Sequence, residues 1–246
     1  MTPRTRTAVA GLGLAALLAG VLTACATTSG GTAPTGGDPT GSGTPNGDSS
    51  EQEVGAAWLD GGRLIGIVTQ GSSTCIPTAE EATYEDGVMK VTLVDVEGDT
   101  ACTADLAPRV SLVGVPEGVD PAQGVEIEVT GDGWQGDTDL DGVPDLAAGG
   151  ETDYLPSAGW TDVDGQFVVL SWGSSSCAPV VENTEATSAT EITVTFATPP
   201  EDQVCTMDMA PRAVVTSVLE ADDDAETFAI LTGGEFDNVR VPIYPN

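Results

Sequence analysis

The 246-residue chain contains no histidine. Hydrolases of the Ser-His-Asp or Cys-His type need an imidazole base, so the sequence excludes them. It excludes histidine-based zinc sites for the same reason. Aromatic residues make up only 4% of the chain, and just one of the seven basic residues, Lys90, is a lysine. No Ser-x-x-Lys pattern precedes that lysine, so serine–lysine catalysis is not indicated either.

The shortage of basic residues stands against an excess of acidic ones. Asp and Glu number 39, which gives a formal net charge of −32. Such a balance argues against nucleic acid and anionic lipid as partners of the folded body. It favours solubility and attracts cations. A solvated acidic surface is the simplest interpretation of most of the individual carboxylates.

The N-terminus is the part of the chain with a positive charge. Arg4 and Arg6 precede an apolar run over residues 8–21, which ends in Leu22-Thr23-Ala24-Cys25. This is the layout of an exported segment, and the run is too short to count as a spanning helix. An ordinary cleaved signal followed by a coincidental cysteine is the alternative interpretation.

Small residues placed directly before Cys25 resemble the lipobox of bacterial lipoproteins. The resemblance implies a signal peptide over residues 1–24 and a diacylglycerol thioether on Cys25, which would anchor the protein on the outer face of the cell membrane. Two acyl chains are enough for stable anchoring. Without Arg4 and Arg6 the mature chain has five basic residues, and its net charge is −34.

Cys25 is followed, up to residue 52, by a tract that is nearly all Gly, Ser, Thr, Pro, Ala and Asp, and together they make the segment 25–52. A tract of this composition cannot bury enough apolar surface to fold, so we expect a disordered tether. A Gly/Pro tether behind a lipobox resembles surface lipoproteins of high-GC Gram-positive bacteria. That resemblance carries no activity with it.

The body is a tandem repeat. Gly-Ser-Ser-x-Cys-x-Pro occurs around Cys75 and again around Cys177, and Cys-Thr-x-Asp-x-Ala-Pro-Arg begins at Cys102 and at Cys205. Four cysteines allow three pairings, and the repeat favours Cys75–Cys102 with Cys177–Cys205, one disulfide in each copy. We therefore predict one domain over 53–148, a junction over 149–156 and a second domain over 157–246.

Alternating apolar residues predict an all-β fold. In EITVTFAT, Ile192, Val194 and Phe196 lie on one face, and VEIEVTG alternates in the same way. Gly- and Asp-rich turns separate such segments, and no convincing amphipathic helix is present. We expect two tandem, disulfide-stapled small β-sandwiches or barrel-like domains after the disordered linker.

Residues 137–145 read DTDLDGVPD, an aspartate ladder next to the junction. It resembles the calcium loops of thrombospondin type 3 repeats, dockerins and EF-hands. Ca²⁺ takes six to eight oxygen ligands, and alternating carboxylates on a tight loop converge on one point. The predicted ligands of one structural Ca²⁺ are Asp137, Asp139, Asp141, the Val143 carbonyl and Asp145.

Two departures from the calcium pattern keep an alternative open. Ala148 stands at the position of the bidentate glutamate, and Pro144 lies inside the loop. Glu151 or Asp153 would have to supply the missing oxygens. The alternative is a polar Asp/Gly-rich hairpin turn without a metal.

Tryptophans and the repeated Asp…Arg spacing suggest two further roles. Trp58 and Trp160 recur with the repeat and are predicted to lie in the cores, whereas Trp134 and Trp172 do not recur. Non-repeated tryptophans are the better candidates for a contact surface. The repeated Asp105…Arg109 and Asp208…Arg212 spacing predicts a structural ion pair in each copy.

Two functions remain compatible with the sequence. The first is a non-catalytic surface lipoprotein, a binding or interaction module for an unknown protein or glycan partner. The second is a carboxylate-dependent hydrolase of cell-wall or extracellular glycan, which would need two carboxylates about 5–10 Å apart in a deep pocket. Duplication of stabilising features and the lack of histidine favour the first.

Overall fold

The structure is a computed structural model that describes residues 50–96, 98, 101–219 and 226–246. The predicted signal peptide, Cys25 and the tether up to residue 49 lie outside the described residues. The prediction of disorder is wrong for the last residues of the tether, because Ser50 and Glu51 form a short strand paired with Trp134 and Gln135. Within the described part of the chain, no helix is long and apolar enough to cross a membrane.

The prediction of an all-β fold is confirmed. The described residues form sixteen strands and one 3₁₀ turn, η1 (Asp60–Gly62). The strands of copy one are β1 (Ser50–Glu51), β2 (Gly55–Leu59), β3 (Leu64–Gly71), β4 (Thr78–Ala79), β5 (Thr83–Glu85), β6 (Val88–Val94), β7 (Ala107–Gly114), β8 (Val125–Gly131) and β9 (Trp134–Leu140). Those of copy two are β10 (Ser157–Trp160), β11 (Gln166–Gly173), β12 (Val181–Ser188), β13 (Glu191–Phe196), β14 (Ala210–Ser217), β15 (Phe228–Gly233) and β16 (Phe236–Tyr244).

Copy one is a sandwich of two sheets. A three-stranded sheet runs β2-β3-β7, and a second sheet runs β1-β9-β8-β6-β4 with β5 also paired to β6. The core between them contains Trp58, Ile65, Met89 and Ile127, all fully buried. The alternation that predicted these strands therefore places their apolar faces against one another.

Copy two repeats this arrangement. Strands β10-β11-β14 correspond to β2-β3-β7, and β13-β15-β16 correspond to β6-β8-β9. The unbroken strand β12 takes the place that β4 and β5 share in copy one. A short parallel ladder between β10 and β16 joins the two sheets of copy two into one of seven strands.

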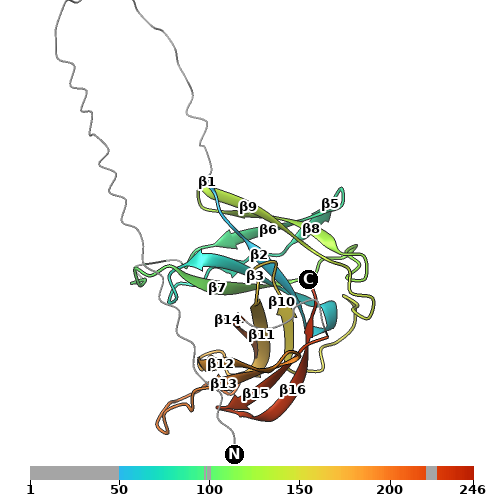
Figure 1. The fold of residues 1–246 in the computed structure, drawn as a ribbon. Helices are drawn as coiled ribbons and strands as arrows, with labels where there is room; N and C mark the ends of the chain where they lie inside the picture. Colours follow the sequence, from blue (N-terminus) through green and yellow to red (C-terminus); the bar gives the residue numbers. More distant parts are fainter. Residues whose placement is uncertain (1–49, 97, 99–100, 220–225) are drawn as a thin grey trace, which may run out of the picture. The chain divides into compact units, whose positions relative to one another are not determined.

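A third core lies between the copies and was not predicted. Side chains of the two three-stranded sheets meet there, and its buried members are Ala57, Leu59, Val68, Val110, Val168 and Leu170. Successive residues of a strand point to opposite faces. Both faces of these central sheets are therefore covered, which explains the unbroken apolar runs GAAWL and FVVL. Figure 1 shows the central strands between the outer sheets.

The shared core makes the described part of residues 50–246 one compact unit. The predicted copies are recognisable as sandwiches, and the boundaries at 53–148, 149–156 and 157–246 stay predictions. In the structure, the central sheet of each copy is covered on one face by the central sheet of the other copy.

Close contacts between the copies follow an approximate two-fold relation. A Cβ added to Gly159 would lie 2.3 Å from the carbonyl oxygen of Trp58, so only glycine lets β10 cross β2 this closely. A Cβ added to Gly66 would lie 3.3 Å from Cγ1 of Val168, its own equivalent 102 residues later. Equivalent residues meeting one another is the property of an isologous interface.

The junction obeys the same relation. The amide of Asp60 donates to the Ser157 hydroxyl (2.8 Å), and the Asp60 carboxylate binds Arg63 (3.0 Å). The equivalents of Asp60 and Ser157 are Asp162 and Gly55, and a Cβ on Gly55 would lie 2.8 Å from Oδ1 of Asp162. The aspartate after β2 therefore lies against the start of β10, and the aspartate after β10 lies against the start of β2.

The predicted disulfide pairing is confirmed. Cys75 is bonded to Cys102 and Cys177 to Cys205, with Cα–Cα distances of 5.5 and 5.6 Å. Each bond ties the loop after the central strand (β3 or β11) to the loop before the third strand of that sheet (β7 or β14). The staple thus closes one end of each sandwich.

Replacing both cysteines of the second staple, Cys177→Ala with Cys205→Ala, should lower the free energy of unfolding by about 3–4 kcal/mol. The cost arises because a loop of 28 residues regains its freedom in the unfolded chain. Urea unfolding of the variant beside the full chain measures it. The variant Val204→Ala, at a 90% exposed site in the same loop, is the control and should change the midpoint little. Equal midpoints for all three proteins would contradict the staple's role.

Candidate functional site

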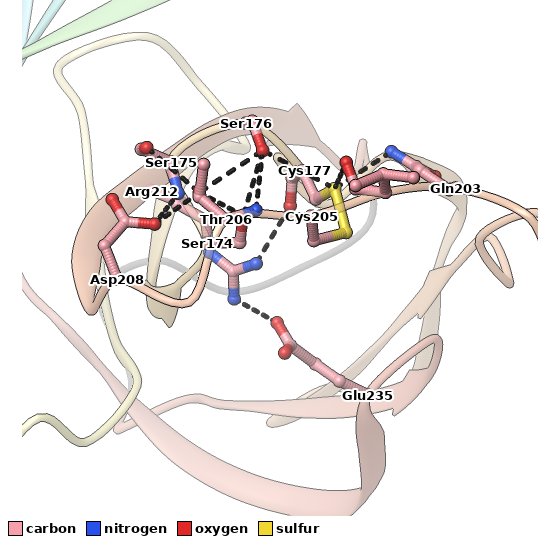
Figure 2. Close-up of a disulfide and its surroundings, with 11 residues drawn as sticks. Ser174, Ser175, Ser176, Cys177, Gln203, Cys205, Thr206, Asp208, Arg212 and Glu235 are labelled. Atoms are coloured by element: carbon pink, nitrogen blue, oxygen red, sulfur yellow. Dashed lines mark hydrogen bonds and ion pairs between the residues drawn. A yellow bond between two sulfur atoms is a disulfide. The ribbon is translucent and has the colours of Figure 1, made fainter.

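The repeated sequence phrases meet at the disulfide-stapled end of each copy. In copy two, loop 174–180 and loop 197–209 are joined by Cys177–Cys205, and the turn between β15 and β16 approaches them. Figure 2 shows this cluster with Arg212 at its centre. The phrase around each cysteine therefore recurs because it builds the same end of two sandwiches.

Arg212 holds the cluster together. Its side chain is only 7% exposed, and it donates to the carbonyl oxygens of Cys177 (2.9 Å) and Trp172 (3.0 Å). The same guanidinium forms an ion pair with Glu235. A Cβ on Gly173 would lie 2.7 Å from Cζ of Arg212, so the glycine of the repeated phrase makes room for the guanidinium.

The predicted Asp208–Arg212 ion pair is wrong. The Asp208 carboxylate instead accepts hydrogen bonds from the amide of Ser175 (3.1 Å) and from the hydroxyl of Thr206. These donors are closer because the staple brings the serine run beside the aspartate. The carboxylate that pairs with Arg212 comes from Glu235, in a hairpin 23 residues later. No repeated spacing in the sequence predicts this pair.

The same correction applies to copy one. Asp105 accepts from the amide of Ser73 (3.3 Å) and from the hydroxyl of Thr103, whereas Arg109 donates to the carbonyl oxygen of Cys75 and to Thr69. The repeated residues thus form a repeated network, with different partners from those that the spacing suggested.

Hydroxyl donors give the two aspartates unusual acidity. The hydrogen bond from Thr206, together with that from Ser175, lowers the pKa of Asp208 to about 2. Thr103 and Ser73 lower the pKa of Asp105 to about 2 in the same way. The serine hydroxyls beside the staple are taken up in this network, as in the 2.7 Å contact between Ser174 and Thr206. They lie in the turns that follow β3 and β11.

A pocket of about 390 Å³ opens beside the staple of copy two. Its apolar lining includes Pro179, Val180, Phe196, Pro199 and Phe236. The two phenylalanine rings pack with their centroids 4.8 Å apart. The Arg212–Glu235 pair also lines the pocket, which is therefore apolar with a few charged groups at fixed positions, as small-ligand sites are.

Copy one differs at this place. Trp134 follows the β8–β9 turn as Phe236 follows the β15–β16 turn, so the expectation that Trp134 has no counterpart is wrong. A Cβ on Gly131 would lie 2.2 Å from Cε2 of Trp134, which places the indole over this glycine. Gly133 stands where copy two has Glu235, so the hairpin offers Arg109 no carboxylate.

Neither predicted contact tryptophan stands free on the surface. Trp134 packs against the core of copy one, and Trp172 packs against the shared core with its ring 5.1 Å from that of Tyr154. Trp58 and Trp160 are buried as predicted. Four strongly exposed apolar side chains of copy two lie instead around the staple: Val180, Val204, Met207 and Met209.

The predicted calcium loop is largely not a loop. Asp137 and Asp139 belong to strand β9, directly opposite Glu128 and Glu126 of β8. Their carboxylates point to the exposed face because Thr138 and Leu140 point inward, which is the alternation of a strand. Carboxylates spaced along an extended strand do not converge as they do on a turning loop.

Two of the remaining predicted ligand residues make hydrogen bonds through their backbone carbonyls. Asp141 accepts a hydrogen bond from the indole of Trp58 (2.9 Å) at its carbonyl oxygen, and the Val143 carbonyl accepts from the amide of Leu146 (3.0 Å). Gly142 does not have a positive φ, and a Cβ there would lie 2.5 Å from the carbonyl oxygen of Ala122. Glycine is needed at position 142 because the backbone at Ala122 lies too close for a Cβ atom.

Asp145 is exposed in the turn that follows. In the described ranges, no group of three or more His, Cys, Asp or Glu side chains is placed to hold a metal ion. Calcium binding by residues 137–145 therefore stays a prediction from the sequence alone.

Comparison with protein-family models, with curated proteins and with solved structures finds no match to this chain.

The low pKa of Asp208 predicts a pH-dependent role. A carboxyl whose pKa is lower in the folded than in the unfolded chain stabilises the fold above its unfolded pKa, near 3.8, and this stabilisation is lost as pH falls toward about 2. Asp208→Asn should therefore lower the melting temperature at pH 6, and the difference should shrink below pH 4. Solvent keeps the effect small because the carboxylate is exposed.

Melting curves between pH 2 and pH 7 measure this effect, with Asp202→Asn at an exposed neighbouring position as the control. If Asp208→Asn lowers the melting temperature by the same amount at pH 2.5 and at pH 6, the hydrogen bonds of Asp208 do not depend on its charge.

The facing carboxylates of β8 and β9 repel one another, so we expect them to lower the stability of the fold. Asp139→Asn removes one of two like-charged cross-strand pairs and should raise the free energy of unfolding by about 0.2–1 kcal/mol at low salt. The gain should disappear in 1 M NaCl because salt screens exposed charges. Urea unfolding at the two salt concentrations tests this, and a loss of stability at low salt would contradict it.

The same variant tests the predicted calcium site. A calcium site would give the unaltered chain a larger melting shift in CaCl₂ than in MgCl₂ at equal concentration, and Asp139→Asn would remove the difference. Equal shifts in both salts would mean that the ladder is only an acidic sheet face.

Proposed function

We propose that the protein is a surface lipoprotein, anchored to the outer face of the cell membrane through Cys25, whose duplicated β body is a non-catalytic binding module. The lipobox and the tether support the anchor. Two disulfides support an extracytoplasmic location, because such bonds persist in oxidising compartments.

The observation that carries the binding role is the pocket of copy two. It has an apolar lining and a fixed ion pair, and it lies at a loop-rich end of a rigid sandwich, where binding sites are common. Among its polar groups, Arg212 holds Glu235 and two carbonyl oxygens while its buried Nε has no hydrogen-bond partner, and Ser174 is bonded to Thr206. None of them is an activated nucleophile with an adjacent base.

The arrangement of the carboxylates does not fit a glycan hydrolase. The facing residues Glu128 with Asp137 and Glu126 with Asp139 line hollows on the exposed face of a sheet. A glycosidase holds its acid and its base on either side of a bond in an enclosed cleft. The acidic face is better explained as solvated surface.

Cys25→Ala should release the protein from the membrane fraction or leave it unprocessed. The reason is that the cysteine supplies the only predicted anchor. Fractionation with a carbonate wash, followed by detection of the protein in each fraction, measures the change. Ser29→Ala in the tether is the matched control and should stay membrane-bound. A Cys25→Ala protein that remains fully in the washed membranes would contradict the lipoprotein proposal.

A further inference from the structure

We propose that copy two binds an extended polypeptide segment of a partner protein, which adds a strand to the open edge of β16 and places one apolar side chain in the pocket. This inference rests on the proposed binding function and names the ligand class of the same site. Main-chain hydrogen bonds hold the added strand, and the pocket selects its side chain.

Copy one shows a strand of this kind in place. β1 runs parallel to the start of β9, with Ser50 opposite Trp134 (Figure 1). The amide of Ser50 donates to the carbonyl oxygen of Gly133 (3.1 Å). The amide of Gln52 donates to the carbonyl oxygen of Gln135 (2.9 Å). A ladder of two residues is therefore enough to cover this edge.

Copy two leaves the equivalent edge open. The β15–β16 hairpin corresponds to the β8–β9 hairpin, so Glu235 and Asp237 stand where the two acceptors stand in copy one, and both are exposed. The second neighbour of β16 is β10, which pairs with it only at Ile243 and Tyr244. Among the described strands, none covers the start of β16 on this side. The main chain there is available to a strand from elsewhere.

The order of the chain explains the difference between the copies. The equivalents of Ser50 and Glu51 are Thr152 and Asp153, which follow copy one directly. The hydroxyl of Thr152 donates to the carboxylate of Asp60 (2.8 Å), so this segment is held at the junction. A strand beside the start of β16 therefore has to come from a different segment.

Charge and composition favour a partner protein as the source of that segment. A second copy of this chain carries the same strongly negative net charge and is repelled. The tether before Ser50 is rich in Gly and Pro, which are depleted in strands. An extended segment of another protein, with an apolar residue between small polar ones, suits both the edge and the pocket.

A bulge limits the added ladder to the length seen in copy one. The register between β15 and β16 shifts between Leu231 and Gly233, and Asn238 has a positive φ of 53°. A bulge disrupts the ladder locally and bends its strand. The added strand therefore pairs with Phe236 and Asp237, the equivalents of the two residues that β1 covers.

The pocket lies where the added strand places a side chain. Paired residues on neighbouring strands point to the same face of a sheet, so the residue opposite Phe236 lies on the face of the Phe236 ring. That ring lines the pocket together with Pro179 and Val180. In copy one, Ser50 takes this place beside Trp134. In copy two, a pocket of about 390 Å³ offers an apolar side chain room beside the ring.

The test uses the uncharged peptide acetyl-Thr-Leu-Thr-Ser-Thr-amide, whose single leucine fixes the register at the pocket. A first variant carries N-methyl groups on the leucine and serine nitrogens, which face β16 in the proposed ladder. A control variant carries them on the two threonine nitrogens after the leucine, which face away, because successive N–H groups of a strand point to opposite sides. The full chain, labelled with ¹⁵N, is used in nanodiscs of zwitterionic lipid, and its amide signals report place and affinity.

The unmethylated peptide should shift the amide signals of Val180, Phe236 and Asp237. It should leave those of Trp134 and Gln135 unchanged, because β1 already covers them. The first N-methyl variant should bind at least about fivefold more weakly, since one hydrogen bond contributes a factor of roughly 2–10 and two are lost. The control variant should bind as the unmethylated peptide does.

The side-chain contact is tested by a change in the pocket. Val180→Ser should weaken binding of the unmethylated peptide about threefold or more, because Val180 lines the pocket and its apolar contact with the leucine is lost. Val204→Ser is the matched control, at a 90% exposed site that does not line the pocket, and should leave the affinity unchanged. Equal effects of the two changes would overturn the placement of the side chain.

Other results separate this inference from the proposed function. Equal affinities of the two N-methyl variants would overturn strand addition, and the binding function would stand as long as Val180 still shifts. Shifts at Trp134 and Gln135 as large as those at Phe236 and Asp237 would overturn the assignment to copy two. If the unmethylated peptide shifts none of these amides, strand addition is wrong. N-acetylleucine amide, which cannot form the ladder, then decides the binding role of the pocket: a shift of Val180 supports it, and no shift overturns it as well.

Discussion

The structure depends on two central sheets that are apolar on both faces. In β11, Phe167 and Val169 point into the core of copy two, while Val168 and Leu170 point into the core shared with copy one. Strand β2 of copy one is divided in the same way. A sheet of this kind cannot face water on either side without a large cost. Each copy therefore needs the other as a cover, and the duplication is part of the fold.

Because the copies are related by an approximate two-fold axis, the same apolar face of each central sheet is covered by its equivalent in the other copy. Residues 102 apart meet across the shared core. The aspartate after β2 approaches the start of β10, and the aspartate after β10 approaches the start of β2. The buried members of the shared core do not include residues of the stapled loops. There the copies have diverged: Trp134 covers its hairpin in copy one, whereas Phe236 and Glu235 leave a lined pocket in copy two.

Sequence reasoning predicted the strands, the repeat and the disulfides, because period-two alternation and paired motifs are local signals. It missed the shared core, although the unbroken runs GAAWL and FVVL carried the signal of strands covered on both faces. It also took DTDL for a loop, where the inward Thr138 and Leu140 make it a strand. The Arg212–Glu235 pair could not be predicted, since hairpin geometry alone brings these residues together.

Calorimetric unfolding of the full chain and of its Leu170→Ala variant tests the shared core most directly. Leu170 is fully buried between the copies, so its truncation should cost about 2–5 kcal/mol. The account predicts one cooperative transition for residues 50–246, with equal calorimetric and van't Hoff enthalpies, moved as a whole to lower temperature in the variant. Two separate transitions, with one of them unmoved by Leu170→Ala, would show that the copies are independent domains and would contradict the account.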